Sequence, residues 1–433
     1  MRLSGDVGTV DQALLAVLRV RHSWARRAMD ARSVLIIDEI HAGDPYMIAL
    51  VGILVDAHPG PVILLSATLG SHARQRLLRD AGDMNVAYPA LWSGHHPSAV
   101  TAVTQRSYVT EILPRPAILV RVAAAVNAGA RVLVIQSTVA DALEMRERIA
   151  ALGLPVLLHH SRYAEADRRY LDEQVLGLIG KTAERSGGHV LVGTQTLEQS
   201  LDIDADLLVS DACPADVLLQ RAGRCHRHAR PRPPGCETAQ ILLVDPGDIE
   251  DRLTGRPQRP QLGAEGNGWA WVYGALPVAA TLEWLRDHAE IELPRDARAL
   301  VEAATHPESL DRLAERGDVW RIARNHGMGA EHASRRLAEV SVVEVSKPYS
   351  SQPTDPEEHI ATRLGETPVN VVTPGLVSPF TGGEIDCLPF RYRWIGSAQR
   401  NADGEIVAVL LDDGLLEVGE RQFRYDGDGL QRG

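Results

Sequence analysis

Short apolar runs alternate with amphipathic stretches through the first two-thirds of the chain. The apolar runs are nearly continuous and rich in Val, Ile and Leu, as strands of a parallel sheet covered on both faces must be. We expect strands at 34–38, 62–66, 131–136, 156–160, 189–193, 206–210 and 240–245. We expect helices at 11–29, 71–82, 117–129, 139–153, 164–180 and 215–223. This alternation predicts an α/β protein assembled from βαβ units.

The pattern breaks in places that suggest domain boundaries. Residues 84–116 are poorly periodic and contain four prolines, which favours a linker between two α/β lobes. A Pro-, Gly- and Arg-rich stretch begins at 246, and helical sequence follows it to about 340. Strand-like runs at 369–373, 390–395 and 406–411 favour a small mixed unit at the end. The expected domains are a first lobe at 1–100, a second at 112–246, a helical region at 247–345 and an accessory domain at 346–433.

Composition narrows the class of protein. The chain has 433 residues, of which 45% are hydrophobic and 24% charged, so we expect several globular domains rather than a disordered or fibrous chain. No uncharged apolar stretch is long enough to span a membrane, and four scattered cysteines do not form a disulfide framework. We therefore expect a cytoplasmic protein. A formal net charge of −12 argues against a non-specific nucleic-acid coat protein, although a locally basic groove remains compatible with it.

Acidic residues directly follow the first expected strand, in the sequence Asp38-Glu39-Ile40-His41. In α/β sheets, ligands bind outside the carboxyl ends of the strands. An aspartate there can hold Mg²⁺ through water, and a glutamate can orient or deprotonate an attacking water. By itself such a pair is common, and a solvated loop after a core strand explains it better than a functional site does. Ser66-Ala67-Thr68 ends the second expected strand, where hydroxyl groups could bridge to a neighbouring lobe. Ser71 is a better helix cap than these residues.

An arginine-dense segment follows the helix expected at 215–223. Five arginines lie between 221 and 232, and no acidic residue occurs from 218 to 235. On a helix, Arg224 and Arg227 share a face. Guanidinium groups offered to a transferring γ-phosphoryl group stabilise its charge, whereas a solvated basic helix end is the plain alternative.

Each motif is weak alone, but their order along the chain resembles that of superfamily 2 helicases. More specifically, the chain is similar to the CRISPR-associated helicase-nucleases of type I interference. The similar segments are 5–15, 36–47, 64–70, 159–168, 198–204, 220–228 and 362–366. The resemblance implies two RecA-like lobes, ATP and Mg²⁺ as cofactors, and single-stranded DNA and a type I surveillance complex as partners. It implies an ATP-dependent translocase that feeds DNA to degradation.

The resemblance also implies residue roles. Asp38 and Glu39, with His41 in the same motif, would handle Mg²⁺ and the hydrolytic water. Ser66, Ala67 and Thr68 would couple the nucleotide state to lobe closure. Gln220, Arg224 and Arg227 would reach the triphosphate, and Arg221 would lie beside it. Asp202 and Asp204 would lie near the nucleotide or fix the interface between the lobes. The single-strand path would contain Thr9, Gln12, Ser137, Thr138, His160, Ser161, Arg162, Thr194 and Gln195.

One required motif is missing from these 433 residues: no GxxxxGK[ST] phosphate loop precedes Asp38. Gly180-Lys181-Thr182 is a decoy, because it follows an expected helix and lacks the first glycine. We also find no His-Asp pair of the family's nuclease domain. We expect a first lobe truncated at its N-terminus with exposed apolar sheet surface, no ATP turnover by this polypeptide alone, and the nuclease and phosphate loop supplied in cis or trans. The open alternatives are a non-catalytic nucleic-acid-binding remnant and another superfamily 2 helicase acting on RNA.

Overall fold

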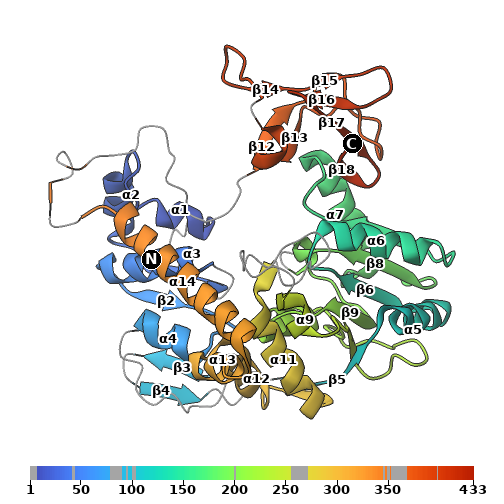
Figure 1. Ribbon diagram of the computed structural model, residues 1–433, viewed down its shortest axis with the longest axis horizontal. Helices are drawn as coiled ribbons and strands as arrows, with labels where there is room; N and C mark the ends of the chain where they lie inside the picture. The colour runs from blue at the N-terminus through green and yellow to red at the C-terminus, as the bar shows by residue number, and fades with distance from the viewer. Residues whose placement is uncertain are drawn as a thin grey trace. The chain divides into compact units, whose positions relative to one another are not determined.

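The computed structural model describes residues 7–40, 44–78, 90–93, 96–99, 104–198, 201–254, 272–344, 347–348, 352, 368–396 and 398–433. These residues fall into two compact units (Figure 1). The first is made from the described parts of Met1–Gln105 and Pro294–Gly365. The second is made from those of Arg106–Gly255, Gln261–Leu293 and Glu366–Gly433. Among the described helices, none combines the length and apolar character that crossing a bilayer requires.

The first unit contains one βαβ element at its centre. Strands β1 (Leu35–Ile37) and β2 (Val62–Leu64) pair in parallel, with Leu35 opposite Val62 and Ile37 opposite Leu64. Helix α3 (Pro45–Ala57) connects them, and the Asp44 carboxylate accepts a hydrogen bond from the Met47 amide at 2.8 Å to cap it. The remaining elements up to residue 99 are α1 (Val10–Leu14), α2 (Ser23–Asp30), α4 (Ser71–Leu78), β3 (Ala90–Ser93) and β4 (His96–Ala99).

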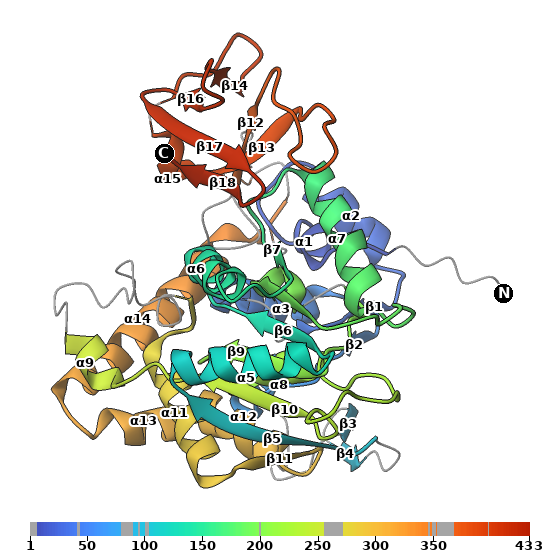
Figure 2. The ribbon, with the colours of Figure 1, turned by 90° about the vertical axis from the view of Figure 1, so that its right-hand side faces the viewer.

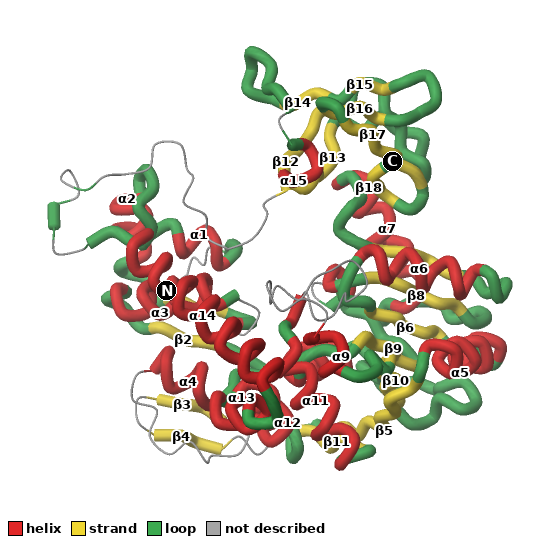
Figure 3. Tube along the Cα trace, in the orientation of Figure 1, coloured by secondary structure: helices red, strands yellow, loops and turns green. Residues whose placement is uncertain are grey.

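A helical segment from much later in the chain completes this unit. It consists of α12 (Ala297–Thr305), α13 (Pro307–Ala314) and α14 (Asp318–Ser341). Helix α14 lies along α3 (Figure 3), and Ala338 is part of the core that Leu14 and Leu50 also form. The Arg19 amide donates to the Ser341 carbonyl at 2.9 Å. The part of the predicted helical stretch that begins at Pro294 therefore belongs to the first unit, whereas the part before it belongs to the second.

One face of the β1–β2 pair exposes apolar side chains. Ile36 is 59% exposed and its parallel neighbour Ile63 is 44% exposed, whereas Ile37, next on the strand, is 5% exposed. Val34 and Leu65 are also exposed large hydrophobic residues. The expected apolar surface on this lobe is thus present among the described residues. It is unusual, because parallel sheets are normally covered on both faces.

The second unit is organised around a seven-stranded sheet with strand order β11-β5-β10-β9-β6-β8-β7 (Figure 2). Its strands are β5 (Arg106–Leu113), β6 (Arg131–Ile135), β7 (Val156–His159), β8 (His189–Gly193), β9 (Leu207–Asp211), β10 (Gln240–Val244) and β11 (Glu290–Leu293). All neighbours pair in parallel except β11, which runs antiparallel to β5. Every residue of β6 and β9 is buried, so both faces of the central strands are covered.

Helices cover this sheet. They are α5 (Arg115–Asn127), α6 (Val139–Ala150), α7 (Glu165–Ile179), α8 (Ala215–Ala222), α9 (Ile249–Thr254) and α11 (Ala275–Asp287), with a short 3₁₀ helix η2 (Gln195–Leu197). Ile118 of α5 and Met145 of α6 share one core with Val132, Val209 and Leu242 of the strands. Apolar residues at helical spacing thus place α5 and α6 on one face of the sheet.

The chain ends in two small sheets that pack on α7. Their strands are β12 (Pro368–Val372), β13 (Cys387–Arg391), β14 (Ile406–Val407), β15 (Val409–Leu410), β16 (Leu416–Val418), β17 (Arg421–Asp426) and β18 (Gly429–Arg432), with α15 (Tyr392–Ile395) between them. Tyr163, just before α7, and Leu171, within it, share a core with Phe390 and Phe423 of the small sheets. We refer to residues 368–433 as the C-terminal sheets.

These observations confirm the predicted α/β fold with a parallel sheet and a small β-rich end. Three expectations on elements were wrong. Residues 106–113, taken as part of a linker, form β5 of the large sheet. The helix expected at 11–29 is interrupted, and His22 has φ of 62° at the break. The strand expected at 390–395 ends at Arg391, where α15 begins. Helix α3 was not predicted, since its residues are apolar on all sides and show no one-sided stripe.

Candidate nucleotide and nucleic-acid site

The first unit brings two of the predicted motifs to one edge of its sheet. Asp38 and Glu39 follow β1, and Ser66 follows β2, which is the adjacent parallel strand. Backbone hydrogen bonds join the two loops, from the Leu65 amide to the Ile37 carbonyl at 2.8 Å and from the Ile40 amide to the Leu65 carbonyl at 3.2 Å. The carboxyl ends of these strands are where an α/β fold binds ligands.

Backbone strain marks the acidic loop. Glu39 has φ of 54°, a left-handed conformation that costs free energy in a residue with a side chain. The Glu39 amide donates to Asp38 Oδ1 at 2.8 Å, and both side chains are exposed. Residues held in sparsely populated conformations cluster at functional sites, so this strain supports a functional loop. His41 lies outside the described residues.

The Ser66–Thr68 loop is a compact turn. Ser66 Oγ accepts a hydrogen bond from the Thr68 amide at 3.3 Å. Ser66 and Ala67 are exposed, whereas Thr68 is buried and its Oγ1 has no hydrogen-bond partner among the described residues. Helix α4 begins after this loop, at Ser71, whose amide and hydroxyl both donate to the Glu302 carboxylate at 2.7 Å. The Glu302 carboxylate, rather than Ser66–Thr68, therefore accepts the hydrogen bonds of Ser71 at the start of α4.

Residues for a single-strand path fall in two places. Thr9 and Gln12 are exposed at the start of α1 in the first unit. In the second unit, the loops after β6, β7 and β8 share one edge of the sheet, since those strands are neighbours. Gln195 is exposed there, and its Nε2 donates to the Ser137 carbonyl at 3.2 Å.

Several of these side chains have local structural partners. Thr138 Oγ1 accepts from the Asp141 amide at 3.1 Å and caps α6. The Ser137 amide donates to Asp211 Oδ2 at 2.7 Å. Burial raises the pKa of Asp211 to about 6 despite that hydrogen bond. Thr194 is buried at the start of η2, and Ser161 is exposed after β7.

His160 and Arg162 do not fit the expected contact with nucleic acid. His160 is fully buried, stacks on Tyr163 with ring centroids 4.4 Å apart, and donates from Nε2 to the Asp428 carbonyl at 3.1 Å. Burial, with the nearby Arg162 charge, lowers the pKa of His160 to about 3. The Arg162 guanidinium lies over the Trp394 ring at 4.8 Å from its centroid. Both side chains are used to hold the C-terminal sheets.

The arginine segment contains side chains in very different surroundings. Arg221 is fully buried and its Nε donates to Glu198 Oε1 at 2.8 Å, so a direct contact with nucleotide does not fit it. Arg224 binds the main-chain carbonyl groups of Glu198 and Leu201. Arg227 is 37% exposed at its side chain and pairs with Asp202, the Arg227 Nε to Asp202 Oδ1 distance being 2.8 Å. Gln220 is half-buried on α8.

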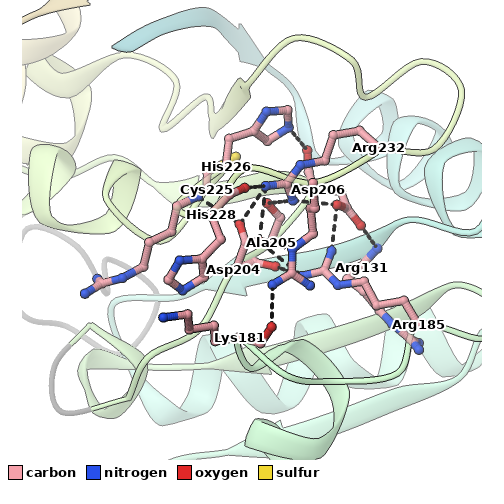
Figure 4. A network of polar contacts seen from close by, with 12 residues as sticks. Arg131, Lys181, Arg185, Asp204, Ala205, Asp206, Cys225, His226, His228 and Arg232 are labelled. Atoms are coloured by element: carbon pink, nitrogen blue, oxygen red, sulfur yellow. Dashed lines mark hydrogen bonds and ion pairs between the residues drawn. The ribbon is translucent and has the colours of Figure 1, made fainter. Parts of the chain in front are cut away.

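Asp204 is a structural anchor rather than a ligand. It is fully buried inside the second unit, where its carboxylate binds Arg232 Nη2 at 2.9 Å (Figure 4). The same carboxylate binds Arg230 Nε at 2.8 Å. Asp206 is equally buried and binds Arg185 and Arg232. Sequence reasoning did not identify Asp206, although an acidic residue at the start of a buried strand is a signal of such an anchor. Neither expected position of Asp204, near the nucleotide or between the lobes, fits this burial.

The residues around Lys181 fit the interpretation of a decoy. Gly180-Lys181-Thr182 follows α7 rather than a strand, and Lys181 is exposed. The Lys181 carbonyl accepts from Arg230 Nη2 at 2.9 Å. Phosphate loops follow a strand and open a helix, so this segment lacks the required context.

The donor set of the first unit suits magnesium only in part. Among the described residues, no group of three or more His, Cys, Asp or Glu side chains could hold a metal ion. Magnesium typically uses one or two protein carboxylates together with waters and substrate phosphates. The exposed Asp38 fits that mode, and when bound the ion would supply charge neutralisation for the phosphates.

Comparison with known proteins shows which proteins this chain resembles in sequence and in fold. Residues 128–230 match the family model described as CRISPR-associated nuclease/helicase Cas3, C-terminal. The Cas3 endonuclease/helicase of Escherichia coli K12 is 39% identical over 273 residues, which are 56% of this chain and 31% of that protein. The crystal structure of T. fusca Cas3 superposes with a TM-score of 0.78 at 25% identity, covering 98% of this chain and 56% of that one.

Two further structures are similar to this chain. T. fusca Cas3 with AMPPNP gives a TM-score of 0.76, and a pre-nicking CRISPR RNA-guided surveillance complex gives 0.70, each at 25% identity. The fold is that of a superfamily 2 helicase. The chain is similar to the Cas3 nuclease/helicases, which confirms the resemblance found in the sequence. It spans about a third of the length of the E. coli relative.

Proposed function

We propose that this chain is the helicase portion of a CRISPR type I nuclease/helicase, driven by ATP along single-stranded DNA to feed its degradation. The observation that carries the proposal is the joint placement of Asp38–Glu39 and Ser66–Thr68 after adjacent parallel strands, in a homologue of Cas3. The four cysteines are free thiols, which supports a location in the reducing cytoplasm.

In this proposal the acidic loop handles the nucleotide. Asp38 would hold Mg²⁺ through water, and Glu39 would orient the hydrolytic water. Ser66, Ala67 and Thr68 would transmit the nucleotide state, since their loop is hydrogen-bonded to the acidic one. The structure of T. fusca Cas3 with AMPPNP supports a nucleotide as the ligand.

Cationic groups of the second unit are the further proposed contacts with the triphosphate. Arg227, which is partly exposed, and Arg224 are the proposed arginine fingers, with Gln220 beside them. Such groups act by stabilising charge on the transferring phosphoryl group. Arg221 and Asp204 contribute by holding this segment in place, because both are fully buried.

The proposed strand path uses groups that contact phosphates without reading bases. Thr9 and Gln12 serve in the first unit, and Ser137, Thr138, Ser161, Thr194 and Gln195 in the second. The surveillance-complex structure that resembles this chain supports a CRISPR type I complex as the partner.

We propose further that these 433 residues do not hydrolyse ATP without a phosphate loop supplied in cis or trans. A lysine and a cradle of amide groups normally bind the β- and γ-phosphates, and the sequence contains no GxxxxGK[ST] motif. A phosphate-release assay with oligothymidine tests this point. We expect no turnover above background; robust turnover that Glu39→Gln abolishes would contradict it.

Fluorescence anisotropy with labelled oligothymidine and oligouridine tests the nucleic-acid part. We expect binding that weakens as salt rises, and a loss of about 3- to 10-fold in affinity for Gln195→Ala. Asp412→Ala, an exposed change in the C-terminal sheets, is the control. Tighter binding of oligouridine would favour a helicase that acts on RNA. Binding without any turnover, even with a phosphate loop supplied, would favour a non-catalytic remnant.

A further inference from the structure

A continuous set of polar contacts inside the second unit runs from the turn after β8 to the arginine segment. Gln195 Nε2 donates to Tyr273 Oη at 3.4 Å, and Arg221 Nη2 donates to the same oxygen at 2.8 Å. Arg221 Nε donates to Glu198 Oε1 at 2.8 Å. Tyr273 lies just before α11, outside every motif of the sequence analysis. It joins an exposed glutamine to a fully buried arginine.

The same contacts reach Arg224 through the main chain of Glu198. The Glu198 carbonyl accepts from Arg224 Nε at 3.1 Å and from Nη2 at 2.6 Å. Arg224 Nη1 donates to the Leu201 carbonyl at 2.5 Å. The direction of the Arg224 guanidinium is therefore set by the carbonyl groups of Glu198 and Leu201, and the Glu198 carboxylate is held by Arg221.

The Glu198–Arg221 pair has the properties of a rigid anchor. Arg221 has no exposed surface and Glu198 is 6% exposed. Arg221 Nη1 also donates to Ser210 Oγ at 2.8 Å, and its guanidinium carbon lies 5.8 Å from the Tyr273 ring centroid. Each terminal nitrogen of the guanidinium is thus satisfied, as a buried charge requires. Removing one partner would leave a charge buried without its counter-ion.

We propose that Glu198, Arg221 and Tyr273 are positioning residues. They connect Gln195, a proposed contact with the DNA strand, to Arg224, a proposed arginine finger. The inference rests on the proposed function, since it takes Gln195 as a strand contact and Arg224 as a nucleotide contact. A strand bound at Gln195 restrains Tyr273, and Tyr273 restrains Arg221, which holds Glu198. Tyr273 and Glu198 would thereby make the arginine finger respond to DNA.

Hydrogen exchange of the full chain, read by mass spectrometry with and without oligothymidine, tests this connection. Two variants remove single links: Tyr273→Phe deletes the hydroxyl and keeps the ring, and Glu198→Gln keeps an acceptor and removes the charge. Tyr163→Phe is the matched control, because it deletes another buried hydroxyl of the second unit, which donates to the Gly427 carbonyl at 2.9 Å.

In the native chain we expect oligothymidine to slow exchange in peptides covering 194–198 and also in those covering 220–228. In Tyr273→Phe and Glu198→Gln we expect the first protection to remain and the second to be lost. If these residues served only in packing, the variants would not lose the protection of 220–228 while keeping that of 194–198. Protection of 220–228 that persists in both variants would overturn the proposal.

If oligothymidine protects neither segment of the native chain, the proposed DNA contact is wrong. The positioning role is then tested by hydrogen exchange of the variants without DNA. Tyr273→Phe should then raise exchange in 220–228 by about 5-fold relative to Tyr163→Phe, as loss of one buried hydrogen bond predicts. Equal exchange in those two variants would refute the positioning role itself.

Discussion

Tyr425 Oη donates a hydrogen bond to Asp167 Oδ2 at 2.5 Å, which joins the C-terminal sheets to the first turn of α7. The Ala164 amide donates to the same hydroxyl at 3.0 Å, and Ser378 Oγ donates to the other Asp167 oxygen. Asp167 is fully buried. Two hydroxyl groups of the C-terminal sheets thus converge on one carboxylate, so their attachment to α7 is specific.

Deleting the Tyr425 hydroxyl should loosen this attachment. We expect Tyr425→Phe to cost about 2 kcal/mol, because hydrogen bonds to charged groups contribute about 1.5–3 kcal/mol. Urea denaturation, followed by hydrogen exchange in β17 and β18, measures it. Tyr392→Phe is the control, since Tyr392 is 62% exposed in the same sheets. An equal stability of the two variants would rule out the proposed strength of this contact.

Removing the Asp204 charge should destabilise the second unit strongly. Asp204→Asn leaves Arg230 and Arg232 buried with less counter-charge, and breaking such a pair typically costs about 3–5 kcal/mol. Asp202→Asn should change stability by less than about 1 kcal/mol, because its pairs are half-exposed. Thermal melting of both variants gives the comparison. A mild effect of Asp204→Asn would mean that the arginines find other partners.

Acidification should weaken the fold through His160. Its pKa is lowered to about 3 in the folded protein by burial, against an ordinary value of 6.5. Below pH 6.5 the unfolded chain takes up a proton that the folded chain does not, so the free energy of unfolding falls as pH falls. The expected slope is up to about 1.4 kcal/mol per pH unit between pH 6.5 and 3.

Comparing the native chain with His160→Gln between pH 7 and 5 isolates this contribution, since glutamine does not titrate. The variant should lose less stability over that interval. Identical pH dependence of the two proteins would show that His160 is protonated in the fold or is not buried there.

The exposed face of β1 and β2 should tolerate polar substitution. Ile36→Thr keeps the β-branch and removes exposed apolar surface, so we expect a stability change within about 0.5 kcal/mol and lower binding of a hydrophobic dye. Ile37→Thr, one residue away on the opposite face, should cost about 2 kcal/mol or more because Ile37 is buried in the core. Dye fluorescence unchanged by Ile36→Thr would mean that this face is covered in solution.

Much of the architecture could be read from the order of residues. Continuous apolar runs predicted seven of the strands, because a strand buried on both faces needs apolar residues at every position. Strand β5 was missed, since its residues mix polar and apolar side chains instead of forming a continuous apolar run, and Pro114 directly follows it. The break at His22 was missed because the helical periodicity of 11–29 continues across it.

The motif order along the chain indicated the resemblance to helicases, and the apolar runs placed Asp38 and Ser66 each at the end of an expected strand. The structure showed that these two strands are neighbours. Only the tertiary structure decided which charged residues are accessible. Arg221 and Arg227 lie six positions apart in one basic run, yet Arg221 is fully buried against Glu198 and Arg227 is partly exposed. Burial and choice of partner depend on residues distant in the chain, such as Tyr273 for Arg221 and Asp428 for His160. The spacing of residues along the chain does not predict those long-range contacts. Apolar periodicity depends only on residues that are near one another in the sequence, so it does predict strands and helices.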